Sequence, residues 1–210
     1  MLVGLIGLIN SGKGTVAHQL VKEYNFRQDS FASSLKDACS VIFDWPRNLL
    51  EGDTQESREW REKNDHWWAE KLNMPDFSPR LALQIVGTDA LRNNFHPDLW
   101  FLTLQNRIRK NPNQHVVISD VRFPNEIKFI QDQKGVLIKV NRGPLPVWYE
   151  VALMANKGNS LAKAAMAQTY SSAHLSEWAW IGTNVDFEIN NDDSLEVLQN
   201  QVRNIASEIL

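Results

Sequence analysis

The sequence predicts an α/β fold with a mainly parallel five-stranded sheet flanked by helices. Residues 2–6 form an apolar run that passes through a glycine-rich turn into a helical pattern. Residues 116–118 and 136–140 form two further apolar runs, and the helical stretch between them is opened by Pro124 and closed by Gly135. Parallel strands joined by crossover helices produce this alternation, because each helix covers one face of the sheet.

The remaining elements follow from hydrophobic periodicity. We expect helices over residues 16–24, 33–45, 57–72, 80–95, 98–110, 125–134 and 194–210, and further strands within residues 25–31 and 185–189. The length favours one domain over residues 1–210. Two segments do not read as sheet: we expect a helical, substrate-binding insertion over residues 46–79 and a lid-like excursion over residues 143–180.

Gly87 interrupts the helical pattern of residues 80–95. A glycine inside a helix costs roughly 1 kcal/mol relative to alanine. We therefore expect a compensating local gain at this position, such as a close approach of another segment to the backbone.

Composition and charge narrow the function classes. The chain has 210 residues, and 22 basic against 25 acidic side chains give a net charge of −3. No global positive field is present to hold a polyanion, so nucleic acid is not an expected partner, whereas a small phosphorylated substrate is compatible. Cys39 is the only cysteine, which excludes an intramolecular disulfide and fits a reducing cytoplasm.

Membrane association is not expected either. No stretch approaches the length of a membrane span, and the apolar start lacks the basic segment of a signal peptide and runs straight into the glycine-rich turn. We therefore expect a cytoplasmic protein. A homodimer stays open, because the terminal helix could face solvent, a partner or the core.

The glycine-rich turn, GLINSGKGT at residues 7–15, matches a phosphate-binding loop. Backbone N–H groups of such a loop, at the start of a helix, surround phosphate oxygens. Lys13 adds a mobile positive charge, and the hydroxyl of Thr15 is placed to join the Mg²⁺ shell of a nucleoside triphosphate. A chance glycine-rich turn is the less favoured alternative, because both flanks have the required strand and helix patterns.

Asp120 and Arg122 follow the apolar run at residues 116–118. An aspartate at the carboxyl end of such a strand can hold Mg²⁺ directly or through water. An arginine two residues later can stabilise a transferring phosphoryl group. An aspartate after a strand is common by itself, but together with the phosphate loop it predicts a catalytic and metal-binding position.

A second group of polar residues suits an acceptor substrate. Lys36 lies just beyond an expected strand end, where it can meet a second phosphate or simply be a solvated helix lysine. Arg80 and Gln84 share one helical face, and a glutamine amide offers both the donor and the acceptor that a nucleobase edge requires. Arg92 is a further polar member of the same segment.

Other candidate residues are more ambiguous. His96 has no second histidine nearby and is interpreted as structural or surface. His174 could contact phosphate or cap a helix, and we leave both open. Trp67 and Trp68 are adjacent on a helix and cannot both face one ligand, which favours a structural role.

With these residues assembled, the chain resembles the bacteriophage deoxynucleoside monophosphate kinase family. The resemblance rests on GLINSGKGT, SFASSLKDA, PRLALQIVGTDALRNNFHPDLW, SDVRFPNE and AHLSE, in that order, and so spans nearly the whole chain. The phosphate loop is shared by many NTPases. The order and spacing of the other segments are more specific.

The resemblance implies a P-loop kinase fold and ATP-dependent phosphorylation of a deoxynucleoside monophosphate with Mg²⁺, in the host cytoplasm if the chain is phage-encoded. It implies ATP binding by the loop, catalysis by three residues and acceptor binding by six. The ATP-binding residues are Asn10, Ser11, Gly12, Lys13, Gly14 and Thr15; the catalytic ones are Lys13, Asp120 and Arg122; the metal-binding ones are Thr15 and Asp120; and the substrate-binding ones are Lys36, Arg80, Gln84, Asp89, Arg92 and Trp100.

Two alternatives stay open at this point. Another small-molecule P-loop kinase, acting on adenylate, dephospho-coenzyme A or phosphomevalonate, has the same loop. Ile9, which stands where adenylate kinase has a proline, and the lack of an arginine-rich lid disfavour adenylate kinase. From a different class, a nucleotide-binding switch or assembly NTPase would also use the loop, but two excursions over one phosphate site better suit closure on two substrates.

Overall fold

The computed structural model describes residues 1–210 and divides them into two compact units. The sheet unit comprises residues 1–30 and 111–210, and the helical unit comprises residues 31–110. Each unit has a hydrophobic core of its own.

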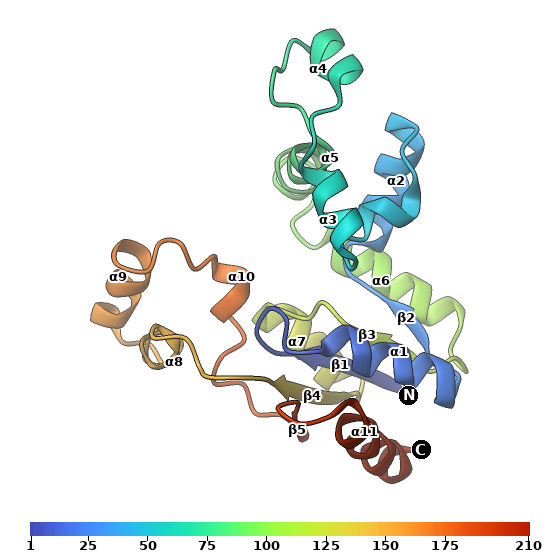
Figure 1. The fold of residues 1–210 in the computed structure, drawn as a ribbon, viewed down its shortest axis with the longest axis vertical. Helices are drawn as coiled ribbons and strands as arrows, with labels where there is room; N and C mark the ends of the chain where they lie inside the picture. The colour runs from blue at the N-terminus through green and yellow to red at the C-terminus, as the bar shows by residue number, and fades with distance from the viewer. The chain divides into compact units, whose positions relative to one another are not determined.

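A five-stranded sheet forms the centre of the sheet unit (Figure 1). Its strands are β1 (Leu2–Ile6), β2 (Arg27–Asp29), β3 (Val116–Ile118), β4 (Val136–Asn141) and β5 (Phe187–Asn190). They lie in the order β2-β3-β1-β4-β5, and every pairing is parallel. The predicted sheet is thereby confirmed, with the strand before the phosphate loop at its middle.

Six helices belong to the sheet unit. They are α1 (Lys13–Tyr24), α7 (Pro124–Asp132), α8 (Tyr149–Asn156), α9 (Ser160–Gln168), α10 (Leu175–Trp178) and α11 (Leu195–Ile209). Helices α8, α9 and α10 lie within the 143–180 segment, where α8 and α9 pack on each other. Whether this segment acts as a lid stays a prediction.

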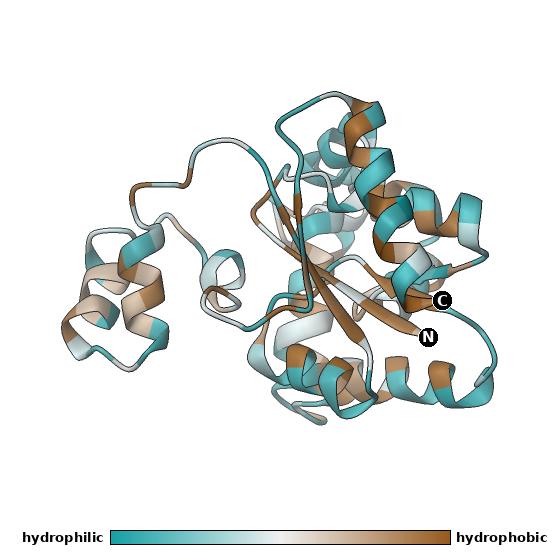
Figure 2. Cartoon of the chain, turned by 90° about the horizontal axis from the view of Figure 1, so that it is seen from below, coloured by the Kyte–Doolittle hydropathy of each residue, from teal (hydrophilic) through white to brown (hydrophobic).

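Alternation along β1 places helices on both faces of the sheet. Val3 and Leu5 point into a core shared with α1 and α11. Gly4 points the other way, where a Cβ would come within 3.0 Å of Leu137 Cδ2 and overlap Ile130 of α7. The three central strands, β1, β3 and β4, are mainly hydrophobic, as the brown strands of Figure 2 show, and this is expected for strands buried on both faces.

The helical unit contains α2 (Ser33–Phe43), η1 (Arg47–Leu50), α3 (Gln55–Glu62), α4 (His66–Leu72), α5 (Pro79–Gln84), η2 (Ile85–Arg92) and α6 (Leu99–Lys110). Its core is rich in aromatic side chains. Trp45 stacks on Phe43 with ring centroids 4.5 Å apart, and Phe77 packs against both. The predicted insertion at residues 46–79 lies inside this unit, and its substrate-binding role stays a prediction.

The single helix predicted over residues 57–72 is wrong. The chain leaves helix α3 after Glu62 and enters α4 at His66. Asp65 causes the break, because its Oδ1 accepts from Trp68 N at 3.1 Å and caps α4, while its Oδ2 accepts from Trp45 Nε1 at 2.8 Å. Of the adjacent tryptophans, Trp68 packs against Phe43 and the core of the unit, as a structural role predicts, whereas Trp67 is 59% exposed.

The segment predicted as one helix over residues 80–95 begins as an α-helix and continues as a π-helix. Helix α5 runs into the π-helical η2, which contains Gly87. A Cβ at Gly87 would come within 2.5 Å of Leu35 Cδ2, which confirms the expected close approach. Trp100 Nε1 donates to Gly87 O at 2.9 Å, so the indole also holds this turn. No helix of the chain combines the length and apolar character needed to cross a bilayer.

Candidate active site

The phosphate loop joins the carboxyl end of β1 to α1. Gly7, Asn10 and Gly12 have φ angles of 146°, 62° and 103°, which favour glycine and, less strongly, asparagine. A Cβ at Gly7 would lie 2.9 Å from Ser11 Oγ and overlap the Val140 carbonyl. No side chain caps the start of α1, so the helix N-terminus offers its N–H groups and positive dipole end to an anion.

Lys13 folds back onto this loop. Its Nζ donates to Gly7 O at 2.8 Å and to Leu8 O at 2.7 Å, with Ser11 Oγ at 3.4 Å. Burial, together with the nearby charge of Arg122, lowers the pKa of Lys13 to about 8. The two cations therefore lie close enough to repel each other, and a phosphate group between them would relieve that repulsion.

Asn191 is a loop contact that sequence reasoning missed. It follows β5, and its Nδ2 donates to Ser11 O at 2.9 Å. The same amide lies where a Cβ of Gly12 would be. Glycine is therefore needed at position 12 for two reasons: its φ angle and the space that Asn191 occupies. The signal in the sequence was the polar run after the last strand, since the carboxyl ends of parallel strands gather at one edge of the sheet.

Asp192, the next residue, fixes the start of the 143–180 segment. Its Oδ1 accepts from Gly143 N at 2.6 Å. Asn191 and Asp192 therefore tie one short loop to the phosphate loop on one side and to the connection after β4 on the other.

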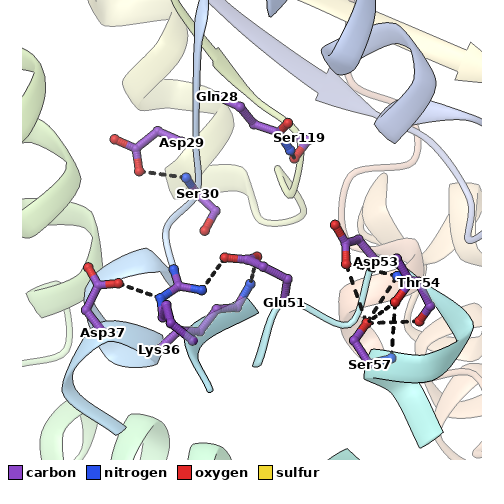
Figure 3. Close-up of polar contacts among 11 residues, drawn as sticks. Gln28, Asp29, Ser30, Lys36, Asp37, Glu51, Asp53, Thr54, Ser57 and Ser119 are labelled. Carbon is purple, nitrogen blue, oxygen red and sulfur yellow. Dashed lines mark hydrogen bonds and ion pairs between the residues drawn. The ribbon is translucent and has the colours of Figure 1, made fainter. Parts of the chain in front are cut away.

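Asp120 and Arg122 lie directly after β3, which pairs with β1. Buried Glu126 shapes their turn, because its Oε2 accepts from Arg122 N at 2.8 Å and from Phe123 N at 3.1 Å. Ser119 Oγ, one residue before Asp120, accepts from Gln28 Nε2 at 3.0 Å (Figure 3). The structure thus brings Asp120, Arg122 and Lys13 to the same edge of the sheet.

The side chain of Arg122 reaches α10. Its Nη1 donates to Ser176 Oγ at 3.2 Å. His174 Nδ1 accepts from Ser176 N at 3.2 Å, so His174 caps α10, which was one of its two predicted roles. An exposed arginine held only by a serine hydroxyl is free to turn toward a phosphate.

A cavity of about 270 Å³ opens beside the phosphate loop. Leu8 forms one wall, and the end of β4 with the residues after it forms another. The aromatic side chains of Tyr149 and Trp180 and the polar side chains of Asn141 and Arg142 also line it.

The predicted acceptor residues all lie in the helical unit. Lys36 Nζ pairs with Glu51 Oε2 at 2.6 Å (Figure 3), and Arg80 Nη1 pairs with Glu62 Oε1 at 2.7 Å. Gln84 and Asp89 are exposed. Arg92 has a buried Nε without a hydrogen-bond partner, and Trp100 is buried in the core. Their substrate-binding roles stay predictions.

The strand order, the glycine-shaped loop and Lys13 define the class of protein: an α/β protein with a P-loop. No family model matches the chain. A protein of Acanthamoeba polyphaga mimivirus, named provisionally as a deoxynucleotide monophosphate kinase, is 38% identical over 156 residues, which cover 68% of this chain and 74% of the relative. The chain therefore belongs to the deoxynucleotide monophosphate kinase family.

A second relative agrees with this assignment. The deoxynucleoside-5'-monophosphate kinase of Escherichia phage T5 is 29% identical over 180 residues, covering 63% of this chain and 72% of the relative. Among solved structures, dephospho-CoA kinase from Campylobacter jejuni matches 99% of this chain and 96% of its own with 20% identity and a TM-score of 0.46.

Proposed function

We propose that the chain transfers the γ-phosphoryl group of ATP to a deoxynucleoside monophosphate, giving the diphosphate and ADP, with Mg²⁺ bound at the ATP phosphates. The observation that carries the proposal is the convergence of Lys13 and Arg122 beside the uncapped start of α1. Two cations and a helix N-terminus at one place suit a highly charged phosphate chain. Membership of the family supports the choice of acceptor.

Phosphoryl transfer needs positioning and positive charge. Its transition state is loose, with charge spread over the three equatorial oxygens. Lys13 is placed to leave the carbonyls of Gly7 and Leu8 and bind phosphate oxygens, while Arg122 is placed to bind the transferring group. We nominate no general base, because the reaction does not require one.

Thr15 and Asp120 fit a magnesium ion that binds mainly to the substrate. The chain holds no cluster of three or more His, Cys, Asp or Glu side chains suited to a metal ion. Mg²⁺ commonly takes only one or two protein ligands and completes its shell with water and substrate phosphates. When bound, the ion would neutralise charge on the β- and γ-phosphate oxygens.

The cavity beside Leu8 supports a place for the base of ATP. Its volume of about 270 Å³ is near the roughly 300 Å³ at which ligand pockets begin. Tyr149 and Trp180 offer aromatic surface, and Arg142 offers a cation that can lie over a base. We further propose that residues 143–180 close over the phosphates. In this motion the Arg122–Ser176 hydrogen bond would break as Arg122 turns to the bound phosphate.

The helical unit would hold the acceptor. We propose that residues 46–79 act as a substrate-binding subdomain and that Lys36, Arg80, Gln84, Asp89, Arg92 and Trp100 contribute to binding. Lys36 and Arg80 would exchange their carboxylate partners for the acceptor. The Arg80–Glu62 pair is exposed and worth about 1 kcal/mol or less, so its exchange costs little. The side chain of Lys36 is only 12% exposed, so Lys36 needs a replacement anion at the same place.

The test is ADP release from ATP and Mg²⁺ with each deoxynucleoside monophosphate supplied singly. We expect release to depend on the added monophosphate. ADP release without any acceptor would instead support a switch or assembly NTPase, and release only with a non-nucleotide acceptor would support another small-molecule kinase.

A further inference from the structure

Arg61 in α3 lies half-buried in the helical unit without a carboxylate partner. Its guanidinium group packs so tightly against Gly52 that a Cβ there would overlap it, and Gly52 has a φ of 70°. The Nε of Arg61 is buried and makes no hydrogen bond. A buried donor left unsatisfied costs about 1–3 kcal/mol, and more when the group is charged.

The acidic side chains near Arg61 are already used by other cations. Glu62 pairs with Arg80 at 2.7 Å. Glu51 pairs with Lys36 at 2.6 Å, as Figure 3 shows, and also with Arg47. These contacts hold the pKa of Glu51 below its usual value although burial alone would raise it.

Positive and negative charges both surround Arg61. Burial and the charge of Arg80 lower the pKa of Arg61 from its usual value, and Arg58 acts in the same sense, whereas Glu62 and Glu51 act to raise it. Arg58 is itself held by the carbonyl of Asp53 at 2.9 Å. We call Arg58, Arg61 and Arg80 the arginine cluster. Burial and the two like charges outweigh the neighbouring carboxylates, which already pair with other cations, so a further anion at the arginine cluster would stabilise the charge of Arg61.

We propose that Arg61 binds the phosphate of the acceptor substrate, with Arg80 as its neighbour at the same group. A phosphate monoester carries two charges and oxygens spaced for the two-pronged guanidinium fork. The inference rests on the proposed function. It adds Arg61 to the six predicted substrate-binding residues; the sequence shows Arg61 only as one of several arginines interleaved with tryptophans in a charged segment.

A structural role for Arg61 makes different predictions. If the side chain served only to hold Gly52, its replacement would lower the thermal unfolding midpoint of the protein without ligand. If Arg61 serves to bind an anion, Arg61→Gln leaves that unfolding midpoint unchanged or raises it, because the variant removes a cation whose charge is unfavourable in the protein without ligand.

The experiment compares ligand binding by isothermal titration calorimetry in wild type, Arg61→Gln, Arg61→Lys and the control Arg109→Gln, which removes the same charge from an exposed position of α6. The ligands are the deoxynucleoside monophosphate that wild type binds best, the matching deoxynucleoside and ADP. We expect Arg61→Gln to weaken monophosphate binding about 10- to 100-fold and to leave deoxynucleoside and ADP binding unchanged. Arg61→Lys should lose less, since it keeps the charge without the fork.

Each other outcome has a definite meaning. Equal monophosphate affinity in wild type and Arg61→Gln overturns this inference alone, as does a loss that extends to the deoxynucleoside or falls on ADP. A wild-type protein that binds no deoxynucleoside monophosphate contradicts the proposed function itself, and with it the inference. If Arg61→Gln fails to fold, Arg61→Lys decides by the same comparison.

Discussion

The side-chain amide of Asn191 donates to the carbonyl of Ser11 at 2.9 Å and joins the last strand of the sheet to the phosphate loop, 180 positions earlier in the chain. The contact lies against Gly12, the residue before α1. The conformation of the loop is therefore fixed from outside as well as by its own glycines.

Asn191→Ala should weaken the binding of ATP and of inorganic tripolyphosphate about 3- to 10-fold, because one hydrogen bond that shapes the loop is lost. Tripolyphosphate has no base, so it reports on the loop alone. Asp193→Ala, at an exposed position of the same connection, is the control. Unchanged tripolyphosphate affinity, measured by calorimetry, would show that Asn191 does not position the loop.

Lys13→Ala should lower kcat about a hundredfold or more, because one preorganised charge at the transferring phosphate is lost. Lys22→Ala removes an exposed lysine from the same helix and should leave kcat unchanged. Both are measured as initial rates at saturating ATP and acceptor. Retained turnover in Lys13→Ala would remove the phosphate loop from the mechanism.

ATP binding should weaken as pH rises through about 8, the pKa to which burial and Arg122 lower Lys13 in the protein without ligand. Below that pH the free protein already carries the charge that phosphate needs. Above it, binding must take up a proton, so the dissociation constant rises by up to about tenfold per pH unit. An arginine in the Lys13→Arg variant does not titrate in this range, and the inflection should vanish. A flat profile in wild type would contradict the lowered pKa.

The lowered pKa of Lys13 also affects the stability of the protein without ligand, which should increase with pH whereas ATP binding weakens. Between pH 8 and 10.5 the Lys13 side chain is charged in the unfolded chain and neutral in the folded loop. The contribution of Lys13 to the free energy of unfolding therefore rises with pH across this window. Urea titrations of wild type and Lys13→Met should differ progressively there and run parallel below pH 7.

Much of the sheet unit was predictable because its signals are local. The apolar runs at β1, β3 and β4 and the glycine pattern of the phosphate loop each depend on neighbouring residues in the sequence. Asn191 was not predictable in the same way. Its partner is distant along the chain, and an asparagine after a short strand resembles any polar turn.

The structure of the helical unit was harder to predict from the sequence, because long-range contacts override the local helical pattern. The sequence of residues 57–72 predicts one continuous helix. In the structure, Asp65 accepts a hydrogen bond from the indole of Trp45 and caps a second helix, so the two helices are separate. In the sequence, Arg61 is one of several arginines in a charged, tryptophan-rich segment, and only the structure shows that the nearby Glu51 and Glu62 pair with other cations. By contrast, the close packing at Gly87 was predictable, because a glycine inside a helix is unfavourable unless another group approaches the backbone there.

Gly87→Ala should lower the free energy of unfolding by about 1–2 kcal/mol, because the added methyl group overpacks against Leu35 by more than the gain in helix propensity. Leu35→Val removes the δ-carbons that clash and should reduce the penalty. Chemical denaturation of both single variants and the double variant measures this coupling. Strictly additive losses would show that Leu35 is not the cause.

The most direct measurement of the central claim follows the label from [γ-³²P]ATP in a single turnover with Mg²⁺ and one deoxynucleoside monophosphate. The account predicts that the label appears in the deoxynucleoside diphosphate, that Lys13→Ala forms this product more slowly by about a hundredfold or more, and that little inorganic phosphate is released. Label found in inorganic phosphate at the same rate with and without the acceptor would contradict it.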